Sequence, residues 1–283
     1  MRKVKEMSAM LHSLLVDWFY SPRTIISAII LIALAYMNAR SFSHMLVNAQ
    51  LYAYPGESIY YFISNGFGNI TLASALFLIM MAEIPRRIAF QNVLLIRSSR
   101  RTWQSSQVLF CCFATLLMII ILLTFSMLFS CSSISAGTGW SDLERIAADP
   151  DAEWLTQLTS EYIRQIAPGQ AALEAFLILF FFWFTMTLII LLCTLFGKPN
   201  AGMIAYVFLL VLHVTVMWEH LPAWMRYMPV NFATMQSIGA TFPEYELQAI
   251  PYVFGGYMII DTLLIVVMNI RVKRMELFFV ERS

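Results

Sequence analysis

Two ionisable residues stand near the middle of long apolar stretches, where a charged side chain is costly. Asp261 lies within the stretch 251–270, and His213 lies within the stretch 201–218. If both stretches cross a membrane as helices, a rise of about 1.5 Å per residue puts the two side chains at similar depths. Ionisable groups at that depth mark ion or proton pathways. Two interpretations stay open: a proton relay between Asp261 and His213, or an acid that faces a water-filled seam or bonds to neighbouring helices.

A second feature is the arginine-rich stretch AEIPRRIAFQNVLLIRSSRRTWQSSQ at residues 82–107, which contains five arginines and no lysine. The planar guanidinium suits partner carboxylates better than an ammonium group does. Topogenic charge and binding of anionic lipid would also explain basic residues here, since both need only charge. The apolar turns that lead into a corner of serines and arginines favour a docking element for a soluble partner. The candidate contact residues are Arg86, Arg87, Arg97, Ser98, Ser99, Arg100 and Arg101.

The sequence lacks the motifs of membrane-embedded enzymes and of ATPases. Neither an H-E-x-x-H helix nor a G-x-S-x-G elbow occurs. The phosphate-binding pattern G-x-x-x-x-G-K fails because Leu192 stands where its first glycine should be. The four histidines are scattered, and the four cysteines lack the spacing of a zinc site. We therefore expect no catalytic residue, no metal site, no cofactor in this chain and no nucleic-acid partner.

The composition places the chain in the membrane class. It has 283 residues, of which 60% are hydrophobic and only 12% are charged, whereas an ordinary soluble domain is about 25% charged. A transmembrane helix needs roughly 20 mainly apolar residues. The sequence therefore predicts one all-α integral membrane domain over 1–283. Its six transmembrane helices are expected at 23–40, 66–83, 107–130, 172–196, 201–218 and 251–270.

Basic residues set the expected orientation, because lysine and arginine favour the cytoplasmic side of short loops. With both termini cytoplasmic, only Arg40, Arg145, Arg164 and Arg226 of the 18 basic residues fall outside. This bias predicts a multi-pass protein of the bacterial cytoplasmic membrane. Residues 84–106 would form its largest cytoplasmic loop, and 271–283 a cytoplasmic tail.

Three segments outside the spans have predicted structure of their own. Residues 1–22 predict an interfacial helix with Leu14 and Trp18 on its apolar face; a cytoplasmic helix docked on the protein is the alternative. The outer loop 131–171 contains a predicted amphipathic helix after Asp149-Pro150, preceded by a capping box that starts at Ser141. Residues 219–250 are divided by prolines and too polar to cross, so they predict a re-entrant helical segment between the fifth and sixth spans.

This arrangement resembles the permease subunits of ABC-2 type ABC transporters. The resemblance rests on the N-terminal helix, the six spans with both ends inside, the loop around LLIRSSRRTW and the dipping segment before the last span. In that family the loop between spans two and three is a coupling helix that sits in a groove of the nucleotide-binding subunit. The resemblance implies that role for residues 84–104, with Arg97 to Arg101 at the tip. The long outer loop 131–171 departs from the many relatives in which this loop is short.

The resemblance further implies the transmembrane permease subunit of an ATP-driven exporter. Its partners would be a separate cytosolic ATPase that binds ATP and Mg²⁺, a second permease subunit, identical or different, and membrane lipid. The expected cargo is amphipathic: a peptide, a lipid-linked glycan or a drug-like compound. Two alternatives remain. One is an ion-gradient-driven carrier or channel that uses Asp261 and His213, and the other is a non-transporting membrane anchor or immunity subunit.

Overall fold

The computed structural model describes residues 2–64, 70–82, 99–137, 139–141, 165–216 and 246–274. This part of the chain is mostly helical and contains no strand beyond an isolated parallel bridge between Ala53 and Ile134, so the prediction of an all-α fold is confirmed for it. The helices in chain order are α1 (Arg2–Phe19), α2 (Pro22–Ala49), α3 (Pro55–Ser64), α4 (Thr71–Met81), α6 (Arg100–Ser130), η2 (Cys131–Ser133), α9 (Pro168–Leu195), α10 (Pro199–Val216) and α12 (Glu246–Arg274).

Among the described helices, 4 are long and apolar enough to cross a membrane, namely α2, α6, α9 and α12. They overlap the predicted spans 23–40, 107–130, 172–196 and 251–270. The helices α4 and α10 are apolar but shorter, and they overlap the predicted spans 66–83 and 201–218. The count of six spans therefore stays a prediction. The expected re-entrant segment and the expected outer amphipathic helix fall almost entirely outside the described residues.

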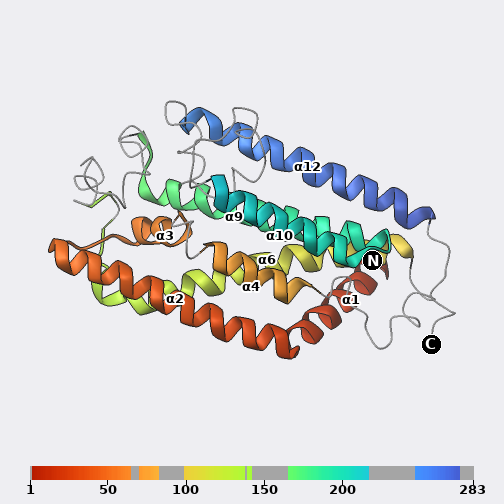
Figure 1. Ribbon diagram of the computed structural model, residues 1–283, viewed down its shortest axis with the longest axis horizontal. Coiled ribbons are helices and arrows are strands. Elements are labelled where there is room, and N and C mark those ends of the chain that lie inside the picture. The colour runs from red at the N-terminus through yellow and green to blue at the C-terminus, as the bar shows by residue number, and fades with distance from the viewer. Residues whose placement is uncertain are drawn as a thin grey trace.

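The helices form an elongated bundle with two distinct ends (Figure 1). α1, the start of α6, the turn between α9 and α10 and the end of α12 lie at one end, here called the α1 end. α3 and the starts of α9 and α12 lie at the other, here called the α3 end. The segments at the α1 end carry the basic residues of 2–5, Arg100 and Arg101, Lys198 and 271–274. Positive charge is thus concentrated at one end of the bundle.

α1 is the N-terminal helix predicted from the apolar spacing, and it packs against the first turns of α6. Its buried side chains include Met10, Leu14 and Trp18, which recur every four residues and so share one face. The Trp18 ring meets Phe110 edge-on with centroids 5.9 Å apart, and the Ser106 hydroxyl donates to Met10 Sδ at 3.8 Å. The helix is docked on the protein; contact of its opposite face with lipid headgroups stays a prediction.

A tight turn joins α9 to α10, as the short Gly197-Lys198-Pro199-Asn200 link predicts. Gly197 has φ +76°, a left-handed conformation that glycine adopts without a steric penalty. The Gly197 and Lys198 amides donate to the carbonyls of Thr194 and Cys193 at 2.9 and 3.0 Å, which is the Schellman pattern for ending a helix. A Cβ on Gly202 would meet Ile190 Cα at 2.9 Å, so this glycine lets the two helices approach closely.

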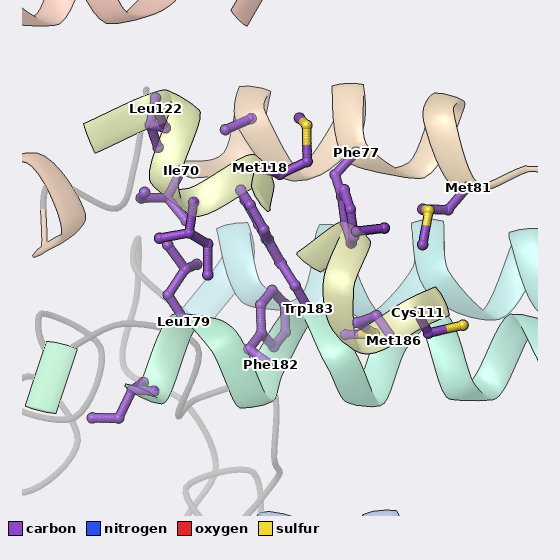
Figure 2. Packing of buried hydrophobic residues seen from close by; sticks show 14 of the residues in the cluster. Ile70, Phe77, Met81, Cys111, Met118, Leu122, Leu179, Phe182, Trp183 and Met186 are labelled. Carbon is purple, nitrogen blue, oxygen red and sulfur yellow. The ribbon is translucent and has the colours of Figure 1, made fainter. Parts of the chain in front are cut away.

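α9 is the central helix of the bundle. It contacts α3, α4, α6, α10 and α12, and 56% of its most apolar window is buried, against 22% for that of α12. The core around it draws on α4 and α6, with Phe77, Met118 and Trp183 among its side chains (Figure 2). Phe77 stacks on Trp183 with ring centroids 4.9 Å apart. Because five helices contact α9 on several of its faces, its apolar residues show no amphipathic stripe.

Residues 41–65, which connect the first two predicted spans and would be expected to form a loop, are largely helical. α2 continues to Ala49, and α3 begins at Pro55 after a short connection. Tyr54 is followed by Pro55 at the first helical position. Glu57 lies three residues after Tyr54, and its carboxylate accepts from the Tyr54 amide at 3.1 Å. This is a proline start combined with half of a capping box. The Tyr54-Pro55-Gly56 sequence, which suggests a turn, is therefore the start of a helix.

Candidate functional site

The predicted docking corner is described only in its second half. Arg86, Arg87, Arg97 and Ser98 lie outside the described residues. Ser99 is the N-cap of α6: its backbone is extended (φ −79°, ψ 146°) and its side chain accepts from the Thr102 amide at 3.2 Å. The two hydroxyls of Ser99 and Thr102 are 2.7 Å apart. This cap fixes the start of α6, because the Ser99 side chain satisfies the Thr102 amide, which has no carbonyl acceptor within the helix.

Arg100 and Arg101 are the first two residues of α6, so α6 begins seven residues before the expected span at 107. Residues 100–106 of the expected loop are therefore helix. Positive side chains oppose the helix dipole at this position, at a cost of roughly 0.3–1 kcal/mol each. Arg101 is exposed and Arg100 is partly exposed. Helix stability therefore does not account for the pair, which adds to the positive charge of the α1 end.

Three helices meet at Ser74 on α4. The indole N–H of Trp183 on α9 donates to the Ser74 hydroxyl at 2.7 Å, and the hydroxyl of Tyr206 on α10 donates to the Ser74 carbonyl at 2.9 Å. All three residues are fully buried. These two bonds, here called the Ser74 node, tie α4 to both members of the α9–α10 hairpin. Any displacement of α4 relative to α10 must break or stretch the second bond.

Asp261 lies on a seam between α9 and α12 and not in an isolated position. The Thr185 hydroxyl donates to Asp261 Oδ1 at 2.6 Å, while Oδ2 has no hydrogen-bond partner in the described part of the chain. One turn toward the α3 end, the Phe181 and Tyr257 rings stack with centroids 6.2 Å apart. The Asp261 side chain is 5% exposed. Of the two open interpretations, a hydrogen bond to a neighbouring helix is the one observed.

The same seam ends in a basic contact. Arg271 Nε donates to the Leu195 carbonyl at 3.4 Å, and its guanidinium carbon lies 5.0 Å from the centroid of the Phe196 ring. The hydrogen bonds at Asp261 and Arg271 both join residues 76 apart in sequence, so α9 and α12 run parallel in one constant register. A cation at the last turn of α9 complements its dipole and satisfies a terminal carbonyl.

The relay partner proposed for Asp261 is not placed by the structure. His213 belongs to α10, but its side chain lies outside what the structure describes. α10 packs mainly on α9 and α4, whereas α12 packs on α9 and α6. The sequence offered no signal for Thr185 as the partner, because pairing across helices depends on their rotation and register.

A second buried carboxylate lies at the α3 end. Glu57 Oε1 accepts from the hydroxyl and the amide of Ser141 at 2.8 and 3.3 Å. Burial raises the pKa of Glu57, and the hydrogen bonds from the Tyr54 amide and from Ser141 lower that pKa in part. Next to it, the Trp140 indole donates to the Ile166 carbonyl at 2.7 Å. These contacts join α3 to both ends of the outer loop 131–171. The sequence did not predict Glu57, Trp140 or Ser141 as site residues.

No group of 3 or more His, Cys, Asp or Glu side chains within the described ranges is arranged to hold a metal ion. Nor do those ranges bring Asp261 together with the arginines of the docking corner, which belong to different levels of the bundle. No protein-family model, curated protein or solved structure matches this chain. The function is therefore argued from the geometry of these sites.

Proposed function

We propose that this chain is the permease subunit of an ATP-driven exporter and that a separate cytosolic ATPase docks on the arginine corner. The observation that carries the proposal is the pair Arg100 and Arg101 at the positive end of α6. They stand where helix stability disfavours them, directly after a serine cap, at the end of the bundle that concentrates basic residues. A guanidinium fork at such a corner can pair with carboxylates in a groove of a soluble partner.

The packing behind the corner supports transmission of a push. α4 precedes residues 83–98 in the chain and α6 follows them, so force on that segment would act on both helices. α1 braces the start of α6 through Trp18 and Met10. α4 is joined to α10 at the Ser74 node. In the proposed cycle, ATP binding to the partner favours one arrangement of α4 against α10, by no more than its differential affinity for the two arrangements.

A second permease subunit, identical or different, would complete the transport path. The outward faces of α10 and α12 carry exposed apolar side chains, among them Phe208, Met258 and Leu263. Such faces suit lipid or another permease. The cargo remains amphipathic in this proposal: a peptide, a lipid-linked glycan or a drug-like compound. Export across the bacterial cytoplasmic membrane, with both termini inside, is part of the same proposal.

The test is whether a neighbouring reading frame encodes a soluble ATPase with a Walker motif, and whether that ATPase co-purifies with this chain. Reversing the charge of Arg97, Arg100 and Arg101 to glutamate should abolish recovery of the ATPase, because the docking contacts become repulsive. Lys198→Glu is the matched control, since Lys198 is an exposed cation at the same end in a different connection. It should leave recovery unchanged.

Removing basic residues can also invert the topology of a membrane protein, so the variants need an insertion control. Alkylation of Cys131, which is exposed at the α3 end, by an impermeant reagent reports that end's side of the membrane. The proposal fails if the triple variant is inserted correctly and still recovers the ATPase at the level of the unaltered chain.

A further inference from the structure

α12 is the least covered of the four long apolar helices. It lies along one edge of the bundle (Figure 1), and it packs on α9 and α6. Only 22% of its most apolar window is buried within the described part of the chain, against 39% or more for α2, α6 and α9. Its buried side chains include Tyr257, Asp261 and Met268, whose spacing places them on one face. Elsewhere the helix is open: a Cβ added to Gly255 or Gly256 would meet nothing within 4 Å.

A second face of α12 follows a seven-residue repeat. Four residues succeed one another at spacings of three, four and three and so form a single stripe, here called the α12 stripe: Ile259, Thr262, Val266 and Asn269. The first three are exposed, and Asn269 is partly exposed. This repeat is typical of helices that pair with a left-handed twist. β-branched residues at its leading position, here Ile259 and Val266, favour two parallel strands. The α12 stripe therefore has the pattern of a helix-pairing seam.

Two members of the α12 stripe are polar, although α12 is apolar enough to cross a membrane. Thr262 lies next to the centre of the apolar helix Ala249–Lys273, and Asn269 lies about 10 Å nearer the α1 end. No hydrogen bond joins either side chain to another described residue, whereas the Thr194 hydroxyl on α9 donates to the Ile190 carbonyl at 2.8 Å. Lipid tails supply neither donors nor acceptors. The polar groups of the stripe therefore favour a protein partner over lipid at this face.

The α12 stripe is complementary to a second copy of itself. Two copies inserted in the same orientation bring their α12 helices together in parallel, and a two-fold axis between them places each residue opposite its own counterpart. The Asn269 amide carries both donors and an acceptor, so two such amides satisfy each other. The Thr262 hydroxyl has the same property. Lys273, the next position of the stripe, is exposed at the end of α12, where its ammonium reaches water and is screened.

We propose that two copies of this chain pair through the α12 stripe, as parallel helices in which Thr262 meets Thr262 and Asn269 meets Asn269. The pairing rests on the proposed function for its role, because it makes the second permease subunit an identical copy. It needs no ATPase to form. Loss of pairing with ATPase recovery intact would overturn it and leave this face to lipid or to a different subunit. Loss of ATPase recovery with pairing intact would count against the docking corner alone.

The pairing is tested by disulfide crosslinking in membranes that contain the full chain and no ATPase. In a background in which all four cysteines are replaced by alanine, single cysteines are introduced into the stripe by Thr262→Cys and Asn269→Cys. Leu263→Cys and Ile270→Cys are the matched controls, because each lies one residue further along at nearly the same depth and is exposed on a neighbouring face. Two differently tagged copies are co-expressed and oxidised, one tag is captured, and the other tag is detected.

We expect at least about tenfold more of the crosslinked pair at the two stripe positions than at the two controls, because a disulfide forms only between Cα atoms less than about 7 Å apart. Equal crosslinking at all four positions would indicate random collision and would overturn the pairing. Absence of crosslinking at both stripe positions, in variants that are inserted in the membrane at the level of the unaltered chain, would overturn it too.

A second measurement keeps the native cysteines and so does not depend on the cysteine-free background. Resonance energy transfer between donor- and acceptor-labelled copies of the full chain, labelled at a C-terminal tag, is followed in vesicles as the ratio of protein to lipid is lowered. Thr262→Val combined with Asn269→Leu should raise the dissociation constant of the pair at least about tenfold, because the interhelical hydrogen bonds are lost. Leu263→Val combined with Ile270→Val should leave that constant unchanged. Absence of transfer in the unaltered chain would refute the pairing, and equal constants for the Thr262–Asn269 double variant and the unaltered chain would refute the stripe.

Discussion

The Ser74 node provides the sharpest test of the packing, because the Ser74 hydroxyl accepts the hydrogen bond of the buried Trp183 indole. Ser74→Ala keeps the carbonyl that accepts from Tyr206 but leaves the Trp183 N–H without its acceptor at 2.7 Å. An unsatisfied buried donor costs about 1–3 kcal/mol. Coupling energies of such bonds within membrane bundles average about 0.6 kcal/mol and reach about 1.7 kcal/mol. We expect Ser74→Ala to lower the free energy of unfolding by about 1–2 kcal/mol.

A double-mutant cycle isolates this bond. Trp183→Phe removes the indole N–H and retains a ring that can stack on Phe77, at a packing cost of about 1–2 kcal/mol. In the double variant no donor is left unsatisfied, so the combined loss should be smaller than the sum by about 1 kcal/mol. The measurement is reversible unfolding in mixed micelles followed by circular dichroism, which does not depend on tryptophan emission.

The control cycle pairs Ser74→Ala with Thr194→Ala, whose hydroxyl bonds within α9 to Ile190. Thr194 lies 11 residues beyond Trp183, about 16 Å along the helix, so its effect should add to that of Ser74→Ala. A coupling between Ser74 and Trp183 below about 0.3 kcal/mol, no larger than the control, would refute the assignment of the node as an energetic link.

Three further predictions concern the ends of the helices. Gly202→Ala should destabilise the protein by about 1–3 kcal/mol, because the added Cβ meets the α9 backbone, whereas Gly255→Ala, with nothing within 4 Å, should be neutral in the same unfolding assay. Ser99→Ala should cost about 1 kcal/mol and speed amide exchange at Thr102. Burial raises the pKa of Glu57 above that of the unfolded chain, so its protonation stabilises the folded state most at low pH, and that contribution is lost as pH rises through the raised pKa. The difference in melting temperature between the unaltered chain and Glu57→Gln should therefore shrink from about pH 4 upward; a difference that grows with pH would contradict this.

Much of the helix order follows from local chemistry and was predicted correctly. The apolar stretches at 107–130 and 172–196 are helices because they satisfy their own backbone while presenting apolar side chains on all sides. The Gly197-Lys198-Pro199 turn follows from a left-handed glycine before a proline. α6 begins before the expected span at 107, since hydropathy marks where apolar residues begin and the helix begins after its cap, Ser99. α3 was missed for a similar reason, because its start resembles a turn.

Part of the candidate site could likewise be predicted from the sequence, and part could not. The sequence by itself determined that Asp261 is a rare acid in an apolar helix and that arginines gather at one corner, because residue type and hydropathy are properties of the chain. Only the tertiary structure decided that Thr185 bonds Asp261, that Ser74 joins three helices and that Glu57 holds Ser141. Those pairings join residues 76 to 132 positions apart. They depend on the rotation and register of packed helices, which short-range sequence patterns do not encode.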